Sequence, residues 1–318
     1  MFSKLLCVPI RQLRWTWMCL FLLTLPGYGQ SELNLNGAID FHAHSAPDSV
    51  YHSIDADDVA RIAKGLGERG LVLKSHYEPT AELAYMVRKA VPGIELFGGV
   101  VLNLPVGGIN IDAVKSMMSM KGGYGKVVWL PTFQAENAVK VAKGTGPFVS
   151  VSKDGHLLPS VLELIDFLAQ HHEVVLETGH ISAEEGLMVV HEAHQRGVTH
   201  IVVTHAMNSP ISMTIPQMQQ AAHDGAYLEF VYAGVFGAKA PHTISEFVEA
   251  IRAVGPQSCI IATDFGGTGS DPLHPVPHPS HAQGLLDFME ELHKAGISVD
   301  DVNMMAKTNP ALALGLKP

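Results

Sequence analysis

Histidine and acidic residues recur at the ends of short apolar segments in this chain of 318 residues, 18 of which are His. The first of these segments ends Asp40–Phe41–His42–Ala43–His44. Residues two apart on a β-strand point to the same side, so we expect Asp40, His42 and His44 to share one face. The His-x-His pair is weak evidence by itself, because this His content produces roughly one such pair by chance.

The same pattern follows four later apolar segments, which end in Lys74 and His76, in Glu177 and His180, in Thr204 and His205, and in Thr263 and Asp264. An imidazole or carboxylate therefore lies at the carboxyl end of five apolar segments. Neutral imidazoles together with a carboxylate bind divalent transition metals, and Zn²⁺ is the first candidate. A catalytic site of this kind also keeps a coordination position open for water.

Eight apolar segments alternate with amphipathic stretches, and both are expected to position these side chains. The apolar segments cover residues 38–44, 70–76, 94–103, 126–132, 174–180, 200–206, 226–232 and 259–265. Amphipathic stretches include residues 55–69, 80–90, 160–171, 183–196 and 244–254. Near-continuous apolar strands alternating with helices indicate a parallel sheet covered on both faces. We predict an α/β protein with a single-domain (β/α)8 (TIM) barrel, in which strand ends converge on one face.

A doubly wound open sheet is the alternative fold. No GxGxxG or GxxxxGK[ST] motif follows any of the segments, so a nucleotide-binding version has no support. Thr80 and Ser182 are expected to cap the helices that follow them. Residues 148–155 are expected to form a hairpin insertion between the fourth and fifth units.

The first 29 residues have the composition of a secretory signal peptide. They carry Lys4, Arg11 and Arg14 and no acid, followed by an apolar run over residues 15–25 and by Pro26–Gly29. We expect cleavage near Gly29, export to the periplasm or the medium, a barrel domain over residues 30–318, and no stable membrane span afterwards; an uncleaved anchor is the alternative. The mature chain would keep only Cys259 and could form no internal disulfide.

Composition limits the partners. The net charge is −10 and there is no basic tract, so we expect no nucleic-acid partner. With 47% hydrophobic and 16% charged residues, the chain is also not intrinsically disordered. We expect a small-molecule substrate, and association of several copies stays open.

The order of the polar strand ends resembles the amidohydrolase superfamily of metal-dependent hydrolases: His-x-His after the first strand, His after the fifth and sixth, and Asp after the eighth. The closing segment over residues 308–316 is also similar to that superfamily. The resemblance implies that His42, His44 and Asp264 hold a divalent metal. It also implies that His180 either joins this metal or holds a second one with His205. Asp264 would be the general base, taking a proton from the attacking water.

The implied activity is hydrolysis of an amide, ester, lactone or related bond in a small molecule. A mononuclear metal-dependent decarboxylase of the same superfamily is one alternative. A non-catalytic metal-binding or ligand-binding barrel is the other.

One departure concerns the fourth strand, where binuclear members carry a carboxylated lysine or a glutamate that bridges two metals. Residues 127–132 contain neither, so we expect one ion, with two as the alternative. Lys74 could substitute by becoming carboxylated, or could bind a substrate anion. Glu177 could substitute only if Gly179 allows a bulge, because three residues separate it from His180.

The expected roles are therefore as follows. Asp264, His205 and Lys74 are the expected catalytic residues, and Lys74, His76 and Tyr77 are expected to bind substrate. Asp40 and Glu177 are expected to support the site, Asp40 either by orienting a ligand imidazole or by pairing elsewhere. Residues 266–281 form either a lid over the metal or a proline-stiffened loop.

Overall fold

The structure is a computed structural model that describes residues 33–266 and 278–318. The predicted signal peptide lies outside the described residues, as does most of the loop over residues 266–281. Cleavage, export and the role of that loop therefore stay predictions.

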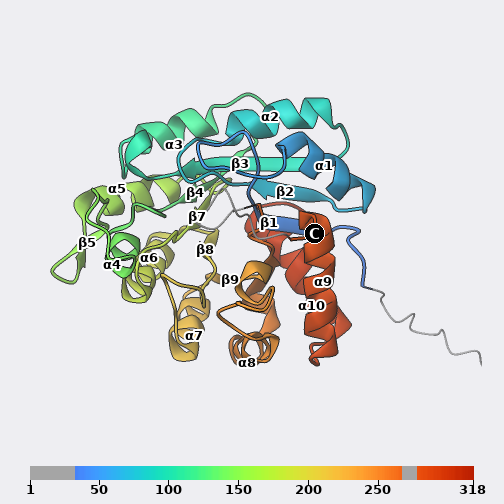
Figure 1. Ribbon diagram of the computed structural model, residues 1–318. Helices are drawn as coiled ribbons and strands as arrows, with labels where there is room; N and C mark the ends of the chain where they lie inside the picture. The colour runs from blue at the N-terminus through green and yellow to red at the C-terminus, as the bar shows by residue number, and fades with distance from the viewer. Residues whose placement is uncertain (1–32, 267–277) are drawn as a thin grey trace, which may run out of the picture. The chain divides into compact units, whose positions relative to one another are not determined.

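Eight parallel strands form one sheet in the order β1-β2-β3-β4-β7-β8-β9-β10 (Figure 1). Their bounds are β1 Ile39–Ala43, β2 Gly70–Leu73, β3 Glu95–Val101, β4 Gly125–Trp129, β7 Val175–Glu177, β8 Ile201–Val203, β9 Tyr227–Val231 and β10 Cys259–Ala262. The last strand returns to the first: Ala43 forms a parallel bridge with Phe265, and the His44 N–H donates to the Phe265 carbonyl at 2.9 Å. This closure confirms the (β/α)8 barrel and excludes the open sheet. Seven of the strands lie within the predicted apolar segments, and β4 begins one residue earlier than predicted, at Gly125.

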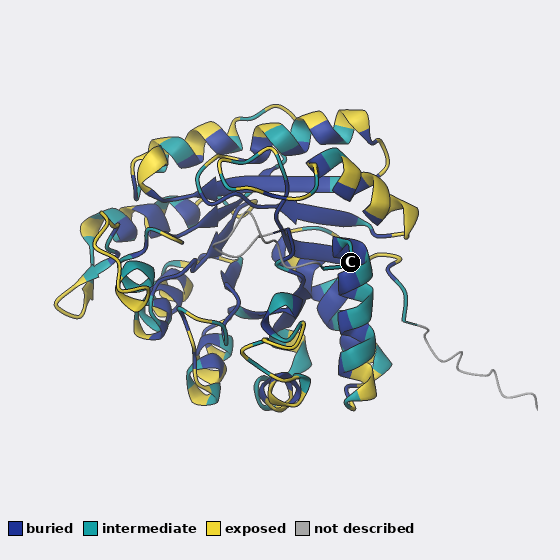
Figure 2. Cartoon of the chain, viewed as in Figure 1, coloured by how far each residue is buried: buried dark blue, intermediate teal, exposed yellow. Residues whose placement is uncertain are grey.

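Helices connect the strands and surround the barrel. The α-helices are α1 Ala56–Gly65, α2 Ala81–Ala90, α3 Ile111–Met118, α4 Glu136–Val141, α5 Pro159–Leu168, α6 Ala183–Arg196, α7 Ile215–His223, α8 Ile244–Val254, α9 His281–Lys294, α10 Val299–Asn303 and α11 Asn309–Ala313. Short turns of other helix types cover Leu104–Val106, Tyr232–Gly234, Pro256–Ser258 and Met304–Thr308. Figure 2 shows their buried residues facing the strands and their exposed residues facing outward.

The two predicted caps have different outcomes. Ser182 caps α6 through a capping box with Glu185, as its hydroxyl and the Glu185 carboxylate each accept from the other residue's N–H. Thr80 is at the N-cap position of α2 as predicted, but its side chain makes no cap hydrogen bond: the hydroxyl donates to the Leu73 carbonyl at 2.7 Å and accepts from the Gly99 N–H at 2.8 Å. Thr80 therefore fastens the start of α2 to β2 and β3.

The predicted hairpin is present, with later bounds. Strands β5 (Ser152–Lys153) and β6 (His156–Leu157) pair antiparallel across a turn at Asp154 and Gly155. Val149, expected within the hairpin, instead forms an isolated bridge with Ala135. The insertion is thus short and lies between β4 and β7.

Apolar side chains fill the barrel from within and separate it from the helices. One buried cluster draws on all eight strands of the barrel, including Phe41, Val72 and Trp129. The same cluster contains Ala311, Ala313 and Leu314 of the closing segment. Arg69, just before β2, donates to the Lys317 carbonyl, so this segment covers the amino-terminal end of the barrel.

Across residues 33–266 and 278–318, no helix is both long enough and apolar enough to cross a membrane.

Candidate metal centre

His42, His44 and Asp264 meet where β1 and β10 end. The Nε2 atoms of His42 and His44 are 3.2 Å apart. Asp264 Oδ1 is 3.1 Å from His42 Nε2 and 3.3 Å from His44 Nε2. Three donors from two neighbouring strand ends therefore face one another and could hold a metal ion.

A β-bulge in β1 turns His42 into the barrel. Asp40 pairs with Leu71 and Ala43 with Leu73, so three steps of β1 oppose two of β2. Phe41 already lies in the interior cluster, and the extra residue lets His42 point inward beside it. The expectation that Asp40 shares the face of His42 and His44 is wrong for this reason.

Asp40 instead joins the backbones of β1 and β10. Its carboxylate accepts hydrogen bonds from the Thr263 N–H at 3.0 Å, from the Thr263 hydroxyl and from the His42 N–H at 3.2 Å. Burial raises the pKa of Asp40 to about 6, against these hydrogen bonds. Of the two roles predicted for Asp40, pairing elsewhere is the one observed.

His180 and His205 form a second pair at the ends of β7 and β8, with their Nε2 atoms 3.1 Å apart. The rings of His205 and His42 stack at 5.9 Å between centroids, so the two pairs are neighbours. Gly179 has φ +61°, and a Cβ there would lie 2.2 Å from the Leu130 carbonyl oxygen. Glycine thus permits the turn that brings His180 inward after Glu177.

Two of these residues have a strained backbone. His205 has φ +22° and Asp264 has φ +53°, a region that non-glycine residues seldom adopt. Such conformations cluster at functional sites, where the surrounding structure holds them in place. Both residues with this conformation, His205 and Asp264, are candidate metal ligands.

The donor set fits a divalent transition metal. A tetrahedral ion with Zn–N distances near 2.0–2.1 Å places its donors about 3.3 Å from one another. The spacings of 3.1–3.3 Å among His42, His44 and Asp264 match this arrangement. Imidazole nitrogen with one carboxylate oxygen is also the ligand chemistry of Zn²⁺ and related ions.

Glu229 of β9 was missed by the sequence reasoning. Its Oε2 lies 3.1 Å from His42 Nδ1 and accepts from the His205 N–H at 2.9 Å. The sequence does carry a signal, since Glu229 is the only charged residue in the apolar segment 226–232. A lone acid inside an otherwise apolar strand needs a partner, and here the partner is a candidate ligand.

Lys74 lies inside the barrel with 2% of its surface exposed. Its Nζ is 3.0 Å from His42 Nε2 and 5.6 Å from the centre of the Trp129 ring. Burial lowers the pKa of Lys74, although Asp264, Glu177 and Glu229 oppose the shift. Lys74 therefore belongs to the candidate centre and does not reach solvent.

Glu177 is also inside the barrel, on the face of Trp129, with which it pairs across β7 and β4. Its Oε2 accepts from the Thr204 hydroxyl at 2.8 Å. Burial, reinforced by the charge of Glu229, raises the pKa of Glu177 to about 8.

His76 lies between the two pairs, with ring centroids 4.9 Å from His44 and 5.7 Å from His180. Its Nδ1 is 2.9 Å from Thr132 Oγ1. Phe133, also missed from the sequence, stacks on His76 at 3.7 Å and leaves 47% of its surface exposed. Tyr77 is 6.5 Å from Phe133, so these rings make an aromatic edge beside the pairs.

Two further histidines, also missed, hold the ends of β1 and β10. His281 Nε2 donates to the carbonyls of His44 and Phe265, each at 2.9 Å. His52 Nδ1 contacts the Gly266 carbonyl, and its Nε2 is 3.0 Å from Asp48 Oδ2. Both histidines act on the backbone beside the candidate ligands.

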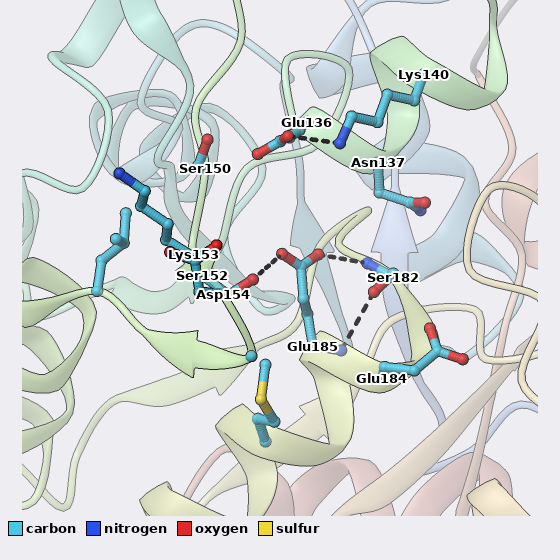
Figure 3. A pocket seen from close by; sticks show the side chains of 13 residues that line it. Glu136, Asn137, Lys140, Ser150, Ser152, Lys153, Asp154, Ser182, Glu184 and Glu185 are labelled. Atoms are coloured by element: carbon cyan, nitrogen blue, oxygen red, sulfur yellow. Dashed lines mark hydrogen bonds and ion pairs between the residues drawn. The ribbon is translucent and has the colours of Figure 1, made fainter.

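A separate hollow of about 770 Å³ lies over α4, the β5–β6 hairpin and the start of α6 (Figure 3). Its polar lining includes the Glu136–Lys140 ion pair and a Ser152–Glu185 hydrogen bond. Asn137 in this lining contacts the centre, since its Nδ2 donates to the His180 carbonyl at 3.2 Å. None of the predicted site residues lines it.

The fold and this cluster define a (β/α)8 barrel with a histidine–aspartate centre at the carboxyl ends of its strands. Organophosphorus hydrolase from Deinococcus radiodurans has a similar structure, with 16% identity and a TM-score of 0.60 over 90% of this chain and 98% of that chain. A protein from Agrobacterium tumefaciens, solved in an apo form, shares 13% identity with a TM-score of 0.56 over 89% of this chain and 97% of that one. A third structure comes from engineering organophosphate hydrolysis into a weak promiscuous lactonase template, with 16% identity and a TM-score of 0.58 over 90% and 98% of the two chains. The predicted superfamily resemblance is thereby confirmed for the fold.

The chain belongs to a family of unknown function (DUF6282), which matches residues 37–229. That match runs from β1 to the middle of β9 and includes four of the five candidate ligands; Asp264 lies beyond it. No curated protein sequence matches the chain.

Proposed function

We propose that this protein is an exported, metal-dependent hydrolase that cleaves an ester, lactone, amide or related bond in a small molecule. The observation that carries the proposal is the convergence of His42 Nε2, His44 Nε2 and Asp264 Oδ1 within 3.1–3.3 Å at the carboxyl ends of the barrel strands. Active sites of (β/α)8 enzymes lie at this end. The shared fold with organophosphorus hydrolase supports the same reaction class.

His42, His44 and Asp264 would hold a divalent cation, with Zn²⁺ as the first candidate. When bound, such a cation polarises a carbonyl or phosphoryl oxygen and makes water easier to deprotonate. The two imidazoles are almost fully buried, whereas 23% of the Asp264 side chain is exposed. Asp264 is thus the member of this set that an entering water can reach.

We assign Asp264 as the general base. Burial would raise the pKa of its carboxyl group, but the charge of His42 and the hydrogen bond with His44 hold that pKa well below its ordinary value. An ionised carboxylate can take the proton of the attacking water and return it to the leaving group.

His180 and His205 offer a second group of donors, so we propose one ion at the first pair and treat a second ion as an outcome of metal analysis. Lys74 lies beside His42 and would act as a cation toward the substrate or, carboxylated, as a further ligand. His76, Tyr77 and Phe133 form the aromatic edge, and we propose that the apolar part of the substrate lies against it.

Metal analysis of the purified barrel tests the proposal, followed by assays with a panel of aryl esters, lactones, amides and phosphotriesters. We expect about one equivalent of bound divalent metal and hydrolysis that a chelator abolishes. Less than about half an equivalent after reconstitution with Zn²⁺, Mn²⁺ or Co²⁺ would contradict the metal-dependent reaction. Cell fractionation tests export, and a purely cytoplasmic full-length chain would contradict it.

A further inference from the structure

Glu229 occupies an unusual place for a charged side chain. It lies in the middle of β9, is fully buried, and follows Leu228 and precedes Phe230. A buried carboxylate is costly unless it is hydrogen-bonded and paired with charge. The contacts of the Glu229 carboxylate therefore indicate its role in the structure.

One oxygen of Glu229 contacts both histidine pairs. Oε2 is 3.1 Å from Nδ1 of His42 and 2.9 Å from the backbone nitrogen of His205. A carboxylate only accepts hydrogen bonds, so His42 must carry its proton on Nδ1 in this contact. With Nδ1 bonded to Glu229, Nε2 is the ring nitrogen of His42 that faces His44 at 3.2 Å, Asp264 at 3.1 Å and Lys74 Nζ at 3.0 Å.

The hydrogen bond at Nδ1 distinguishes His42 from two other candidate ligands. Within the part of the chain that the structure describes, Nδ1 of His44 and Nδ1 of His205 are buried and have no hydrogen-bond partner. Those two rings are held by packing and by their strand ends, whereas a hydrogen bond to an acid also orients His42. The carboxylate–imidazole pairing is the device that fixes ring orientation and raises ligand basicity in metal sites.

We propose that Glu229 is a positioning residue: it sets the tautomer and orientation of His42 and, through the His205 backbone, fixes the second pair relative to the first. This inference rests on the proposed metal site, because it assigns His42 Nε2 as a ligand. Glu229 itself acts through His42 and does not touch substrate.

The experiment measures metal affinity by competition with a chromophoric chelator on the reconstituted protein, comparing Glu229→Gln, Glu229→Leu and the unsubstituted chain. We expect Glu229→Leu to bind Zn²⁺ about 10- to 100-fold more weakly, the cost typical of losing such a partner. Glu229→Gln keeps an oxygen for both contacts but removes the charge, so we expect a loss of about 3- to 10-fold. Glu68→Gln is the matched control, since Glu68 is a buried acid whose Oε1 accepts a backbone N–H, that of Asp40, at 3.0 Å.

A second readout needs no metal. The ¹⁵N shifts of the His42 ring in the metal-free protein report which nitrogen carries the proton. We expect protonated Nδ1 in the unsubstituted chain and in Glu229→Gln, and a shift toward protonated Nε2 in Glu229→Leu.

The outcomes separate this inference from the proposed function. Failure of the unsubstituted protein to bind metal contradicts the proposed function, while the ring shifts still test the contact with Glu229. Metal affinities for Glu229→Gln and Glu229→Leu within about twofold of the unsubstituted protein, with unchanged ring shifts, would overturn the role of Glu229 alone. Should Glu229→Leu fail to fold, the affinity of Glu229→Gln against that of Glu68→Gln decides the question.

Discussion

The two histidine pairs have almost the same internal spacing and different surroundings. The Nε2 atoms are 3.2 Å apart in His42 and His44 and 3.1 Å apart in His180 and His205. The first pair has the Asp264 carboxylate within 3.3 Å of both rings, and Lys74 lies 3.0 Å from His42. For the second pair, the acid in contact is Glu229, and it binds the backbone of His205.

This difference shows that donor spacing alone does not define a reactive centre. Both pairs could contribute to a metal site. Among the described residues, the Asp264 carboxylate and the Lys74 ammonium make their direct contacts with the first pair. We infer that the first pair holds the essential ion and carries the chemistry. The second pair would strengthen metal binding or hold an additional ion.

The largest effect on metal binding is expected when one histidine of the first pair is replaced by alanine, in comparison with one histidine of the second pair. His42→Ala should weaken Zn²⁺ binding by more than about 100-fold, beyond the cost of losing an outer partner, and abolish turnover. His180→Ala should keep about one equivalent of metal, as measured by elemental analysis after dialysis. Equal losses in the two variants would mean that all four imidazoles hold one shared ion, and the distinction between the pairs would be wrong.

Removing the base of the first pair should separate binding from chemistry. Asp264→Asn keeps an oxygen toward the rings but cannot take a proton, so we expect kcat to fall by about 10²- to 10⁴-fold. Most of the metal should remain, which elemental analysis checks on the same sample. Turnover at the parental rate would remove Asp264 as the general base.

Removing the cation of the first pair should have a smaller effect. Lys74→Met should lower kcat/KM by about 10²-fold, the size associated with one positioned electrostatic group. Lys126→Met is the control, because Lys126 lies on β4 and donates to the Glu173 carbonyl at 3.2 Å, away from the pairs. Intact-protein mass spectrometry of the unsubstituted chain, under bicarbonate, would detect carboxylation of Lys74. Unchanged metal content and activity in Lys74→Met would exclude Lys74 from the site.

The last prediction concerns the stability of the fold and Glu177, the acid that precedes His180 in the chain. Burial raises the pKa of Glu177 from its ordinary 4.5 to about 8, so between these pH values the folded chain binds more protons than the unfolded chain. The free energy of unfolding should therefore fall as pH rises through this window. Glu177→Gln should remove that component, on the order of a few kcal/mol, given about 1.4 kcal/mol per pKa unit.

Urea denaturation at pH 5, 6.5 and 8 measures this difference. Exposed Glu184, changed to Gln, is the control for a general loss of charge. Parallel pH dependences in Glu177→Gln and the unsubstituted chain would show that Glu177 is ionised in the folded state.

The order of apolar and polar residues was enough to predict the barrel and the strand ends that hold the candidate ligands. Apolar segments and amphipathic stretches are local patterns, and their alternation admits few folds. The carboxyl ends of parallel strands lie at the same end of a barrel. The sequence therefore sufficed to group the candidate ligands, which are His42, His44, His180, His205 and Asp264.

How these residues combine depends on contacts that form in the folded chain. The bulge that separates Asp40 from His42 depends on the register of β1 against β2, and strand periodicity cannot reveal it. Glu229 and Phe133 join the site from neighbouring units, through contacts between residues far apart in the chain. The different surroundings of the two histidine pairs have the same origin. They depend on which acid and which cation packing brings within about 3 Å of each imidazole, and no local sequence pattern encodes that distance.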